Sequence, residues 1–354
     1  MKKAYLVLGN GRVFEGEAFG ACCEATGEII FNTSCVGYIE TLTDPSYAGQ
    51  IILQTFPLMG NYGIIEEDFV GKCTAKGLVV REWCDTPSNF RSEYDIDKFL
   101  KDNGVAAICG VDTREITRII REEGTMNASI CFSIPADTDA INTYKIEGTV
   151  EELSCKEKEC FPAEGESKFY VTVIDYGSKA GIIPSLCKKG CSVTAVPYNT
   201  SADEILAANP DGIVLSNGAG NPADNEECIE VIKALLGKVP ILGWGLGHQM
   251  AALAAGGKVM KLKYGHHGGN QPVKKAGTTK TYITSQNHSY AVAGETLGGK
   301  AKVTYINAND NTCEGLEYPA LKCISVQFHP EDCINPTDTH TVLDSFIEMM
   351  GGKN

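Results

Sequence analysis

The chain has 354 residues, of which 43% are hydrophobic and 21% are charged. This composition is that of a folded globular protein, and the length exceeds the roughly 250 residues that one hydrophobic core usually serves, so we expect two domains. The net charge of −14 argues against nucleic acid as a partner. No apolar run approaches the roughly 20 residues of a membrane helix and no signal peptide is recognisable, so we expect a cytoplasmic protein with no membrane partner.

The first part of the chain, residues 1–145, combines short strand patterns with turn signals. Apolar runs at positions 5–8, 28–32, 50–56 and 78–81 predict strands separated by glycine-rich or Asp-Pro turns. A helix is predicted between Asp112, a good N-cap residue, and Gly124, because isoleucines at helical spacing lie between them. We expect a mixed β/α domain here, followed by a Glu/Lys-rich linker over residues 146–168.

The second part, residues 169–354, alternates short apolar runs with helix-length segments. Strands are predicted at residues 170–175, 192–197, 212–216, 239–243 and 323–328. Helices are predicted near Lys179, at the capping box of Ser201 and Glu204, near Ala223 and after Gly247. This alternation is typical of an α/β domain with a parallel sheet, in which ligands bind beyond the carboxyl ends of the strands. A site is therefore expected in the loops that follow residues 216, 243 and 328.

Fifteen cysteines are scattered along the chain without a repeated C-x-x-C pattern. We therefore expect reduced, mostly buried thiols rather than disulfides. Cys155 and Cys160 could contact a metal ion, but no second pair or histidine lies near them in the sequence to complete four ligands. We interpret them as solvated cysteines of the linker.

The predicted strand that ends at Gly243 runs into a sharp turn and a helix. Residues 243–247 read Gly-Trp-Gly-Leu-Gly, which is the spacing of a nucleophile elbow. In an elbow, a strained turn lifts the central side chain above the sheet, and backbone N–H groups at the helix start stabilise an oxyanion. The central position should hold Cys or Ser, but it holds Gly245. Taken alone, these glycines favour a tight turn without chemistry.

Two other loops carry candidate chemistry. His329 and Glu331 leave the last predicted strand two residues apart, so on an extended chain they project to the same side, as a base and the carboxylate that fixes its tautomer would. A histidine at a strand end also commonly has only a structural role. The loop over residues 216–222 contains Gly218 and Gly220, which let backbone amides approach a ligand closely.

Together with several longer motifs, these loops make the chain resemble one family. The motifs are Phe-Asn-Thr-Ser-Cys-Val-Gly-Tyr at 31–38, Leu-Thr-Asp-Pro-Ser-Tyr at 42–47, Val-Asp-Thr-Arg at 111–114, Gly-His-His-Gly-Gly-Asn at 265–270 and Ser-Gln-Asn-His at 285–288. The second part resembles a triad-type, class I glutamine amidotransferase domain with a flavodoxin-like parallel sheet. The whole chain resembles the small subunit of carbamoyl phosphate synthase.

The resemblance implies a division of labour. A small subunit of this family binds glutamine, hydrolyses its amide through a cysteinyl thioester and passes ammonia to a large subunit. The large subunit makes carbamoyl phosphate from bicarbonate and ATP for pyrimidine and arginine synthesis. The small subunit needs no cofactor, since ATP and Mg²⁺ are used by the large one, and the two form a heterodimer or an assembly of heterodimers.

The resemblance also implies roles for individual residues. His329 and Glu331 fall on the base and its orienting acid, and the backbone N–H groups of Gly220 and Leu246 on the oxyanion hole. The residues that fall where the family holds glutamine are Ser46, Gly218, Gly220, Leu246, Gln249, Asn287, Ser289 and Tyr290. His266, His267 and His288 also raise a metal hypothesis, but the flanking glycines and the resemblance favour a loop beside the glutamine site, so no metal is expected.

The main departure from the family is Gly245, which aligns with the nucleophilic cysteine. A glycine cannot form a thioester, and no Cys or Ser lies within two residues of it. The milder departures are Trp244 for a small aliphatic residue, Ser289 for a glycine, Ala219 for a proline and Gly181 for an asparagine. We therefore expect glutamine hydrolysis to be impaired or lost. The alternatives are a non-catalytic glutamine-binding or scaffolding subunit that supports ammonia-dependent synthesis, and a hydrolase that uses a cysteine from elsewhere in the chain.

Overall fold

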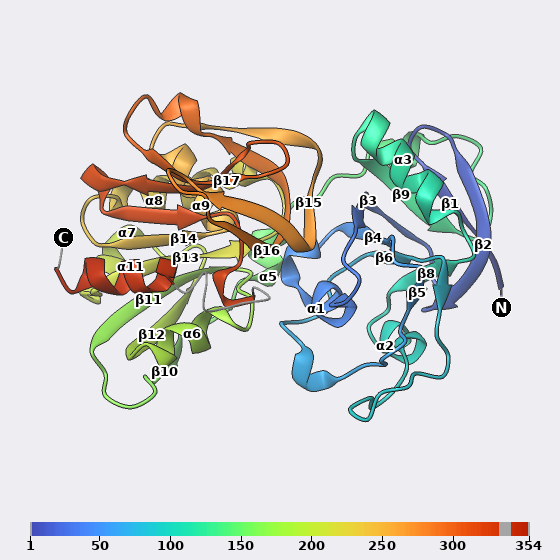
Figure 1. Cartoon of the computed structure of the whole chain (residues 1–354), viewed down its shortest axis with the longest axis horizontal. Coiled ribbons are helices and arrows are strands. Elements are labelled where there is room, and N and C mark those ends of the chain that lie inside the picture. The colour runs from blue at the N-terminus through green and yellow to red at the C-terminus, as the bar shows by residue number, and fades with distance from the viewer. Residues whose placement is uncertain (1, 333–340, 353–354) are drawn as a thin grey trace. The chain divides into compact units, whose positions relative to one another are not determined.

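The computed structural model describes residues 2–332 and 341–352 and divides into two compact units. One is formed by the chain up to Ile146 together with Lys263–Gly268, and the other by Glu147–Leu262 together with the chain from Gly269 onward. Figure 1 labels many of the elements of both units, numbered in chain order. Each unit has its own sheet and hydrophobic core.

The first unit is built on a closed barrel. Its strand order is β1-β2-β8-β6-β4-β3-β9, with parallel pairs such as β3 with β4 and antiparallel pairs such as β1 with β2. The barrel has no unpaired edge to protect, because closure gives every strand two neighbours. The strands are β1 (Lys2–Leu8), β2 (Val13–Gly20), β3 (Ala25–Asn32), β4 (Gln50–Gln54), β6 (Gly77–Val79), β8 (Ala106–Cys109) and β9 (Met126–Cys131).

Short helices and a small two-stranded sheet complete the first unit. The predicted helix is confirmed as α3 (Thr113–Glu123): the Asp112 side chain accepts a hydrogen bond from the N–H of Glu115, and Gly124 ends the helix at a φ of 100°. The other elements are α1 (Tyr38–Thr43), η1 (Pro45–Tyr47), β5 (Leu58–Met59), η2 (Glu66–Asp68), β7 (Glu82–Trp83), α2 (Ile96–Asp102) and α4 (Asp139–Asn142).

The second unit contains a ten-stranded sheet in the order β10-β12-β11-β13-β14-β19-β18-β16-β15-β17. Its central strands β12, β11, β13, β14 and β19 are parallel, as predicted, and the others add antiparallel edges. The predicted α/β class is therefore confirmed. The strands are β10 (Glu159–Phe161), β11 (Phe169–Tyr176), β12 (Cys191–Pro197), β13 (Gly212–Gly218), β14 (Ile241–Trp244), β15 (Lys258–Lys275), β16 (Thr281–Ala293), β17 (Lys302–Asn307), β18 (Cys313–Tyr318) and β19 (Cys323–Val326).

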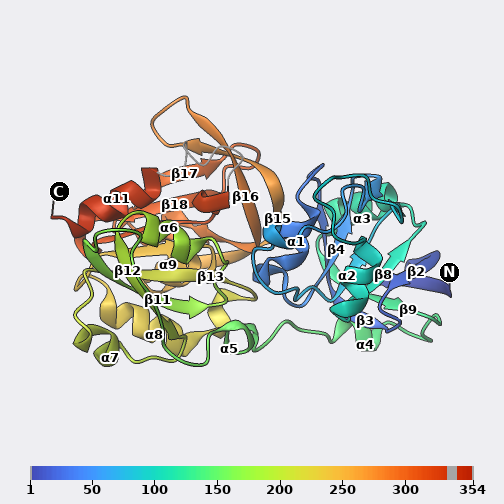
Figure 2. The same cartoon turned by 90° about the horizontal axis from the view of Figure 1, so that it is seen from below.

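Helices cover both faces of the parallel strands, and Figure 2 shows α6 and α11 on the opposite side from α7 and α8. The predicted capping box is present at α7, where the side chains of Ser201 and Glu204 each bond the other's backbone N–H. The helical elements are α5 (Thr149–Leu153), α6 (Ile182–Lys188), α7 (Ala202–Ala207), η3 (Pro222–Asp224), α8 (Glu226–Leu235), α9 (Leu246–Ala254), η4 (Gly294–Leu297), η5 (Pro319–Leu321), η6 (Pro330–Asp332) and α11 (Thr341–Met350).

The segment 146–168, predicted as a linker, is more structured than expected. It contains α5 and β10, and β10 pairs antiparallel with β12. Thr149 and Val150 are buried, and the Thr149 hydroxyl donates a hydrogen bond to the carbonyl of Ala219. The segment is rich in charged residues because most of its positions are exposed and only a few residues, such as Thr149 and Val150, are buried.

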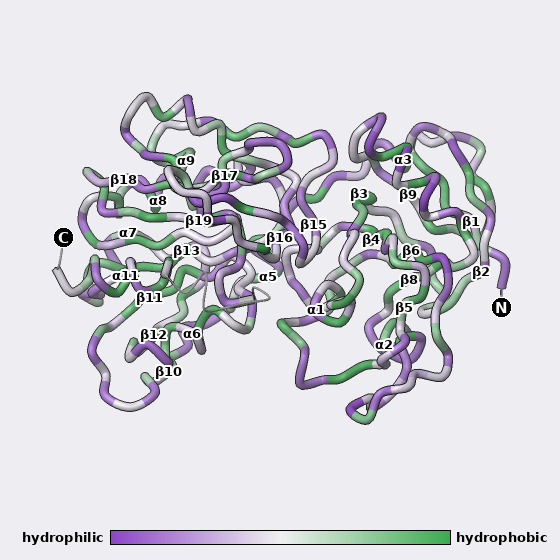
Figure 3. The backbone as a smooth tube through the Cα atoms, viewed as in Figure 1, coloured by the Kyte–Doolittle hydropathy of each residue, from purple (hydrophilic) through white to green (hydrophobic). Residues whose placement is uncertain are grey.

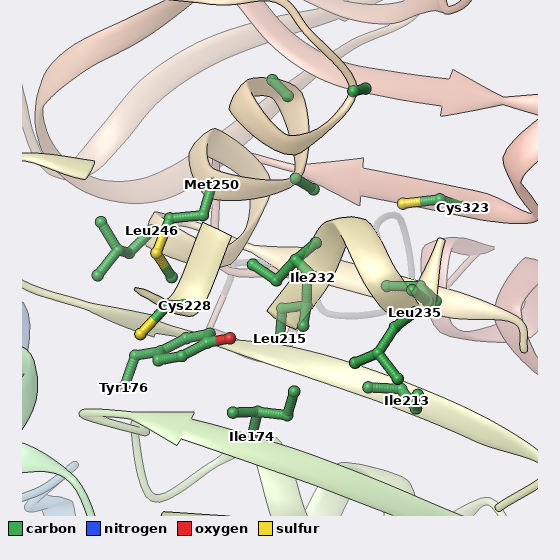
Figure 4. Packing of buried hydrophobic residues seen from close by; sticks show 14 of the residues in the cluster. Ile174, Tyr176, Ile213, Leu215, Cys228, Ile232, Leu235, Leu246, Met250 and Cys323 are labelled. Carbon is green, nitrogen blue, oxygen red and sulfur yellow. The ribbon is translucent and has the colours of Figure 1, made fainter. Parts of the chain in front are cut away.

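The core of the second unit lies on both faces of its sheet, as expected for parallel strands that are covered on both sides. One cluster packs β11, β13 and β14 against α8 and α9, and Figure 4 shows Ile232 and Leu235 of α8 directed toward Ile174, Ile213 and Leu215. A second cluster packs the other face against α6 and α11. In Figure 3, hydrophobic segments follow much of the parallel strands in the middle of this unit.

All cysteines of the described residues are free, and half of them are buried, fewer than predicted. Cys160 is exposed on β10, and Cys155 is partly buried. Cys333 lies outside the described residues. None of the helices in the described ranges is long and apolar enough to span a membrane.

Ile232→Ala tests the packing of α8 on the sheet. Ile232 is 0% exposed, so truncation leaves a cavity, and we expect the free energy of unfolding to fall by about 2 to 5 kcal/mol. Ile283→Ala is the matched control, because Ile283 is 45% exposed and its truncation should change stability by less than about 0.5 kcal/mol. Urea unfolding followed by circular dichroism measures both, and equal losses would contradict this packing.

Candidate active site

A strand-to-helix bend in the second unit brings β14 and α9 close together. Gly243 and Gly247 make this approach possible: a Cβ on Gly243 would lie 3.0 Å from the carbonyl oxygen of Gly247, and a Cβ on Gly247 would lie 2.4 Å from that of Leu215. Both positions exclude larger side chains. The first and last glycines of the predicted elbow are therefore explained by packing.

Gly245, the central residue of this bend, has φ 53° and ψ −109°, a conformation that costs any residue with a side chain about 1 to 3 kcal/mol. Its N–H donates to the carbonyl of Val326 at 3.0 Å, which fixes the bend to β19. A Cβ on Gly245 would lie 3.2 Å from the Cβ of Asn217, its nearest neighbour. The bend therefore has the strained geometry of a nucleophile elbow but presents no side chain, and a small side chain would fit only with a slight shift of Asn217.

The backbone around the bend offers hydrogen-bond donors. No side chain caps α9, and the first turn of a helix leaves its N–H groups without intrahelical partners, so the N–H of Leu246 is available to an oxyanion. Gly218, at the end of β13, is required sterically, because a Cβ there would lie 2.4 Å from the carbonyl oxygen of Tyr176. Gly220 follows with a φ of 94°. The glycines of this loop thus allow the backbone to pass close to neighbouring atoms, as the sequence predicts.

His329 and Glu331 are brought together as predicted. The Nδ1 atom of His329 lies 3.0 Å from Oε1 of Glu331, and their side chains are each only 3% exposed. The N–H of His329 donates to the carbonyl of Ser285, which ties the loop after β19 to β16. Gly245 is adjacent in space to this loop, since Trp244 pairs with Val326, three residues before the histidine. The pair has the geometry of a base and an orienting carboxylate.

Gln249 of α9 is buried and held by two bonds. Its Nε2 donates to the carbonyl of Tyr290 at 2.7 Å and to Oε1 of Gln327 at 2.9 Å. This anchors α9 to β16, on which Asn287 is partly buried and Ser289 buried. The predicted glutamine-binding residues of the second unit thus lie on β13, α9, β16 and the loop between β13 and η3.

Ser46 lies in the first unit, within η1, and is buried. Its hydroxyl donates to Oδ1 of Asp44 at 2.7 Å, and its N–H donates to the same atom at 2.9 Å. Its part in glutamine binding stays a prediction.

Trp244, the bulky residue before the bend, is fully buried in the cluster that faces α6 and α11. The buried hydrophobic residues of α9 pack in the opposite cluster. Its indole Nε1 has no hydrogen-bond partner in the described ranges, which destabilises the fold by about 1 to 3 kcal/mol.

The sequence analysis missed Asn217 and His248. Asn217 accepts a bond from the N–H of Lys179 at its Oδ1 and forms the wall beside Gly245. His248, at 0% exposure, lies 2.8 Å from the Ser325 hydroxyl through Nδ1, and burial lowers its pKa to about 3, so the ring is neutral. A polar residue inside an otherwise apolar strand or helix start was the available signal.

The buried cysteines of the second unit are poor substitutes for a nucleophile. Burial raises the pKa of the Cys228 thiol to about 11 and those of Cys313 and Cys323 to about 12. These thiols therefore remain protonated at neutral pH, whereas the reactive form is the thiolate.

Two of the three histidines of the metal hypothesis, His267 and His288, make hydrogen-bond contacts through their rings. His288 lies with Nδ1 at 2.7 Å from the carbonyl of Tyr290 and Nε2 at 3.0 Å from Oε1 of Gln286. Nε2 of His267 lies 3.2 Å from the carbonyl of Tyr264. These contacts orient the rings, and the expectation of no metal stays a prediction.

Comparison with known proteins agrees with this architecture. Residues 6–130 match the family described as carbamoyl-phosphate synthase small chain, CPSase domain. A solved structure of a glutamine amidotransferase from Thermotoga maritima gives a TM-score of 0.41 at 19% identity, over 51% of this chain and 96% of that chain. Residues 172–349 match the class-I glutamine amidotransferase family, so the second unit is a class I glutamine amidotransferase domain.

Two relatives extend the match to the whole chain. The carbamoyl phosphate synthase small chain of Listeria monocytogenes serotype 4b (strain F2365) is 44% identical over 359 residues, covering 100% of this chain and 98% of that protein. The pyrimidine-specific small chain of Bacillus subtilis (strain 168) is 45% identical over 353 residues, covering 98% and 96%. The chain belongs to the carbamoyl phosphate synthase small chain family.

His248→Asn tests the buried neutral imidazole. In the folded state the pKa is held near 3, so below about pH 6.5 only the unfolded state takes up the proton, and stability falls by about 1.4 kcal/mol per pH unit. We expect the variant, whose amide can still reach Ser325, to lose this share of the acid sensitivity. Urea unfolding at pH 7, 6 and 5 compares the slopes, and identical slopes for the two chains would contradict the assignment.

Proposed function

We propose that this chain is the small chain of a carbamoyl phosphate synthase of the glutamine-dependent family. We further propose that this chain has lost the ability to hydrolyse the amide of glutamine. In this proposal it pairs with a large subunit, which makes carbamoyl phosphate from bicarbonate, ATP and free ammonia. The chain itself uses no cofactor. The observation that carries the proposal is the bend at Gly245, which has an elbow's backbone geometry and no side chain.

The rest of the site supports an amidotransferase origin. The side chains of His329 and Glu331 are paired and buried, no side chain caps α9, and Gly220 has a positive φ of 94°. These are the base, orienting acid and oxyanion donors that acyl transfer requires. The group that attacks the amide is missing at position 245.

The loss of that group decides the outcome. Without a thiol, water must attack the amide directly, and removal of the nucleophile from a hydrolytic triad lowers turnover by on the order of a millionfold. A glycine at this φ relieves the strain that a cysteine carries there, so the replacement raises stability or leaves it level. The replacement therefore removes hydrolytic activity without lowering the stability of the fold.

A second candidate function is glutamine binding without hydrolysis. It is favoured by the intact anchoring of Gln249 to Tyr290 and Gln327, and by the steric need for glycine at Gly218. In this second proposal the site still binds glutamine, and its occupancy is signalled to the large subunit.

Gly245→Cys tests the main proposal in the complex reconstituted with the large subunit. The native complex should make carbamoyl phosphate from ammonium but not measurably from glutamine, and the variant should gain glutamine use because His329 and Glu331 remain in place. Gly245→Ala is the matched control, since it adds the Cβ without the thiol and should gain nothing. Equal rates from glutamine and ammonium in the native complex would refute the proposal.

Calorimetry separates the two candidate functions. If the native chain is a glutamine-binding module, titration with glutamine should release heat with millimolar or tighter affinity while a coupled assay detects no ammonia. The absence of heat at millimolar glutamine would leave the scaffolding function alone.

A further inference from the structure

Only one of the two carboxylate oxygens of Glu331, the residue that orients His329, has a hydrogen-bond partner among the described residues. Oε1 of Glu331 lies 3.0 Å from Nδ1 of His329, whereas Oε2 is buried and has no hydrogen-bond partner among the described residues. A buried carboxylate oxygen without a donor is unfavourable, and a carboxylate held at one oxygen can rotate about its terminal bond. The base is therefore oriented by a group that is itself loosely fixed.

A glycine lies directly beside this carboxylate. A Cβ on Gly181 would lie 3.0 Å from Cγ and 3.8 Å from Cβ of Glu331, which is a close contact with that side chain. Gly181 has φ −74° and ψ −21°, an ordinary helical conformation, so the backbone does not require glycine at this position. The backbone at 181 can therefore carry a side chain if Glu331 shifts by a few tenths of an ångström, and that side chain would lie against Glu331.

Neighbouring groups do not replace the missing donor. The loop before α6 is fixed through its backbone: the N–H groups of Gly177 and Ser178 donate to Oδ1 of Asp175, and that of Lys179 donates to Asn217. The Ser178 hydroxyl is itself buried without a hydrogen-bond partner in the described part of the chain. The loop therefore has a rigid frame, and position 181 is the place on it that faces the orienting acid.

We propose that position 181 is a positioning site for the His329–Glu331 pair, and that Gly181 is a second lesion of the amidotransferase site beside Gly245. A short side chain with an N–H donor at 181 would bond Oε2 of Glu331, hold the carboxylate in one rotamer and so fix the imidazole toward residue 245. This inference rests on the proposed function, because it concerns the same hydrolytic machinery. It also predicts that restoring the thiol alone gives an incompletely oriented base.

The test compares variants at 181 in the Gly245→Cys chain. Gly181→Asn supplies a donor, Gly181→Asp has the same size but supplies a second carboxylate, and Gly181→Ala adds only the Cβ contact. With the large subunit bound, Gly181→Asn should raise kcat for glutamine about tenfold, the effect of one well-placed hydrogen bond, while KM changes less than about twofold. Gly181→Asp should lower kcat, and Gly181→Ala should not raise it.

A second readout does not depend on glutamine. The rate at which iodoacetamide alkylates the thiol of Gly245→Cys depends on how well the imidazole accepts its proton. It should rise in Gly181→Asn and fall in Gly181→Asp. Circular dichroism establishes that each variant is folded, and Gly181→Ala isolates the close contact with Glu331 if the larger side chains disturb it.

The outcomes distinguish this inference from the proposed function. If Gly245→Cys gains glutamine hydrolysis but Gly181→Asn is no faster than Gly181→Ala or Gly181→Asp in either readout, the positioning role is overturned and the proposed function stands. If alkylation responds to position 181 as described but the native complex already uses glutamine, the positioning role stands and the proposed function fails.

Discussion

The structure of the site depends on one constraint, which is how closely β14 and α9 approach at the bend. Glycine at 243 and at 247 is imposed by backbone atoms within 3.0 Å of where a side chain would begin, so these positions are fixed by packing. Gly245 differs, because the nearest atom to its hypothetical Cβ is a side-chain atom, the Cβ of Asn217 at 3.2 Å, rather than backbone. The packing therefore requires glycine at the two outer positions more strictly than at 245, where the positive φ is the main obstacle to a side chain.

The polar groups around the bend are held in place by buried hydrogen bonds. Hydrogen bonds of Gln249 and of the neutral His248 anchor helix α9. His329 and its partner Glu331 follow the last parallel strand. Buried, hydrogen-bonded groups of this kind are expensive to rearrange, since any break leaves a polar atom without a partner. In the proposal that hydrolysis is lost, this packing keeps the scaffold in place although Gly245 and Gly181 supply no side chain for the reaction.

Local patterns were sufficient to predict a large part of this structure. Asp112 and Gly124 bracket α3, the Ser201 capping box begins α7, and the apolar runs at 170–175, 212–216 and 323–328 are the parallel strands, because in each case the signal lies within a few neighbouring residues. The pairing of His329 with Glu331 followed from their spacing alone.

What the sequence did not predict depends on contacts between distant segments. Strand β2 carries Glu15 and Glu17 and pairs with β8 some ninety residues later in the chain. The long strand β15 is rich in lysine, glycine and histidine, and β16 has several polar residues, so none of these three strands has a strong strand signature. The partnership of Gly181 with Glu331 spans the whole second unit, and nothing local marks it.

The central claim is that the nitrogen of carbamoyl phosphate comes from ammonia and not from glutamine, because nothing at the bend can attack the amide. The most direct measurement supplies the reconstituted complex with glutamine labelled with ¹⁵N in its amide, together with unlabelled ammonium, and follows the label by NMR. The account predicts carbamoyl phosphate free of ¹⁵N in the native complex. Label entering the product at a rate comparable to that from ammonium would contradict it.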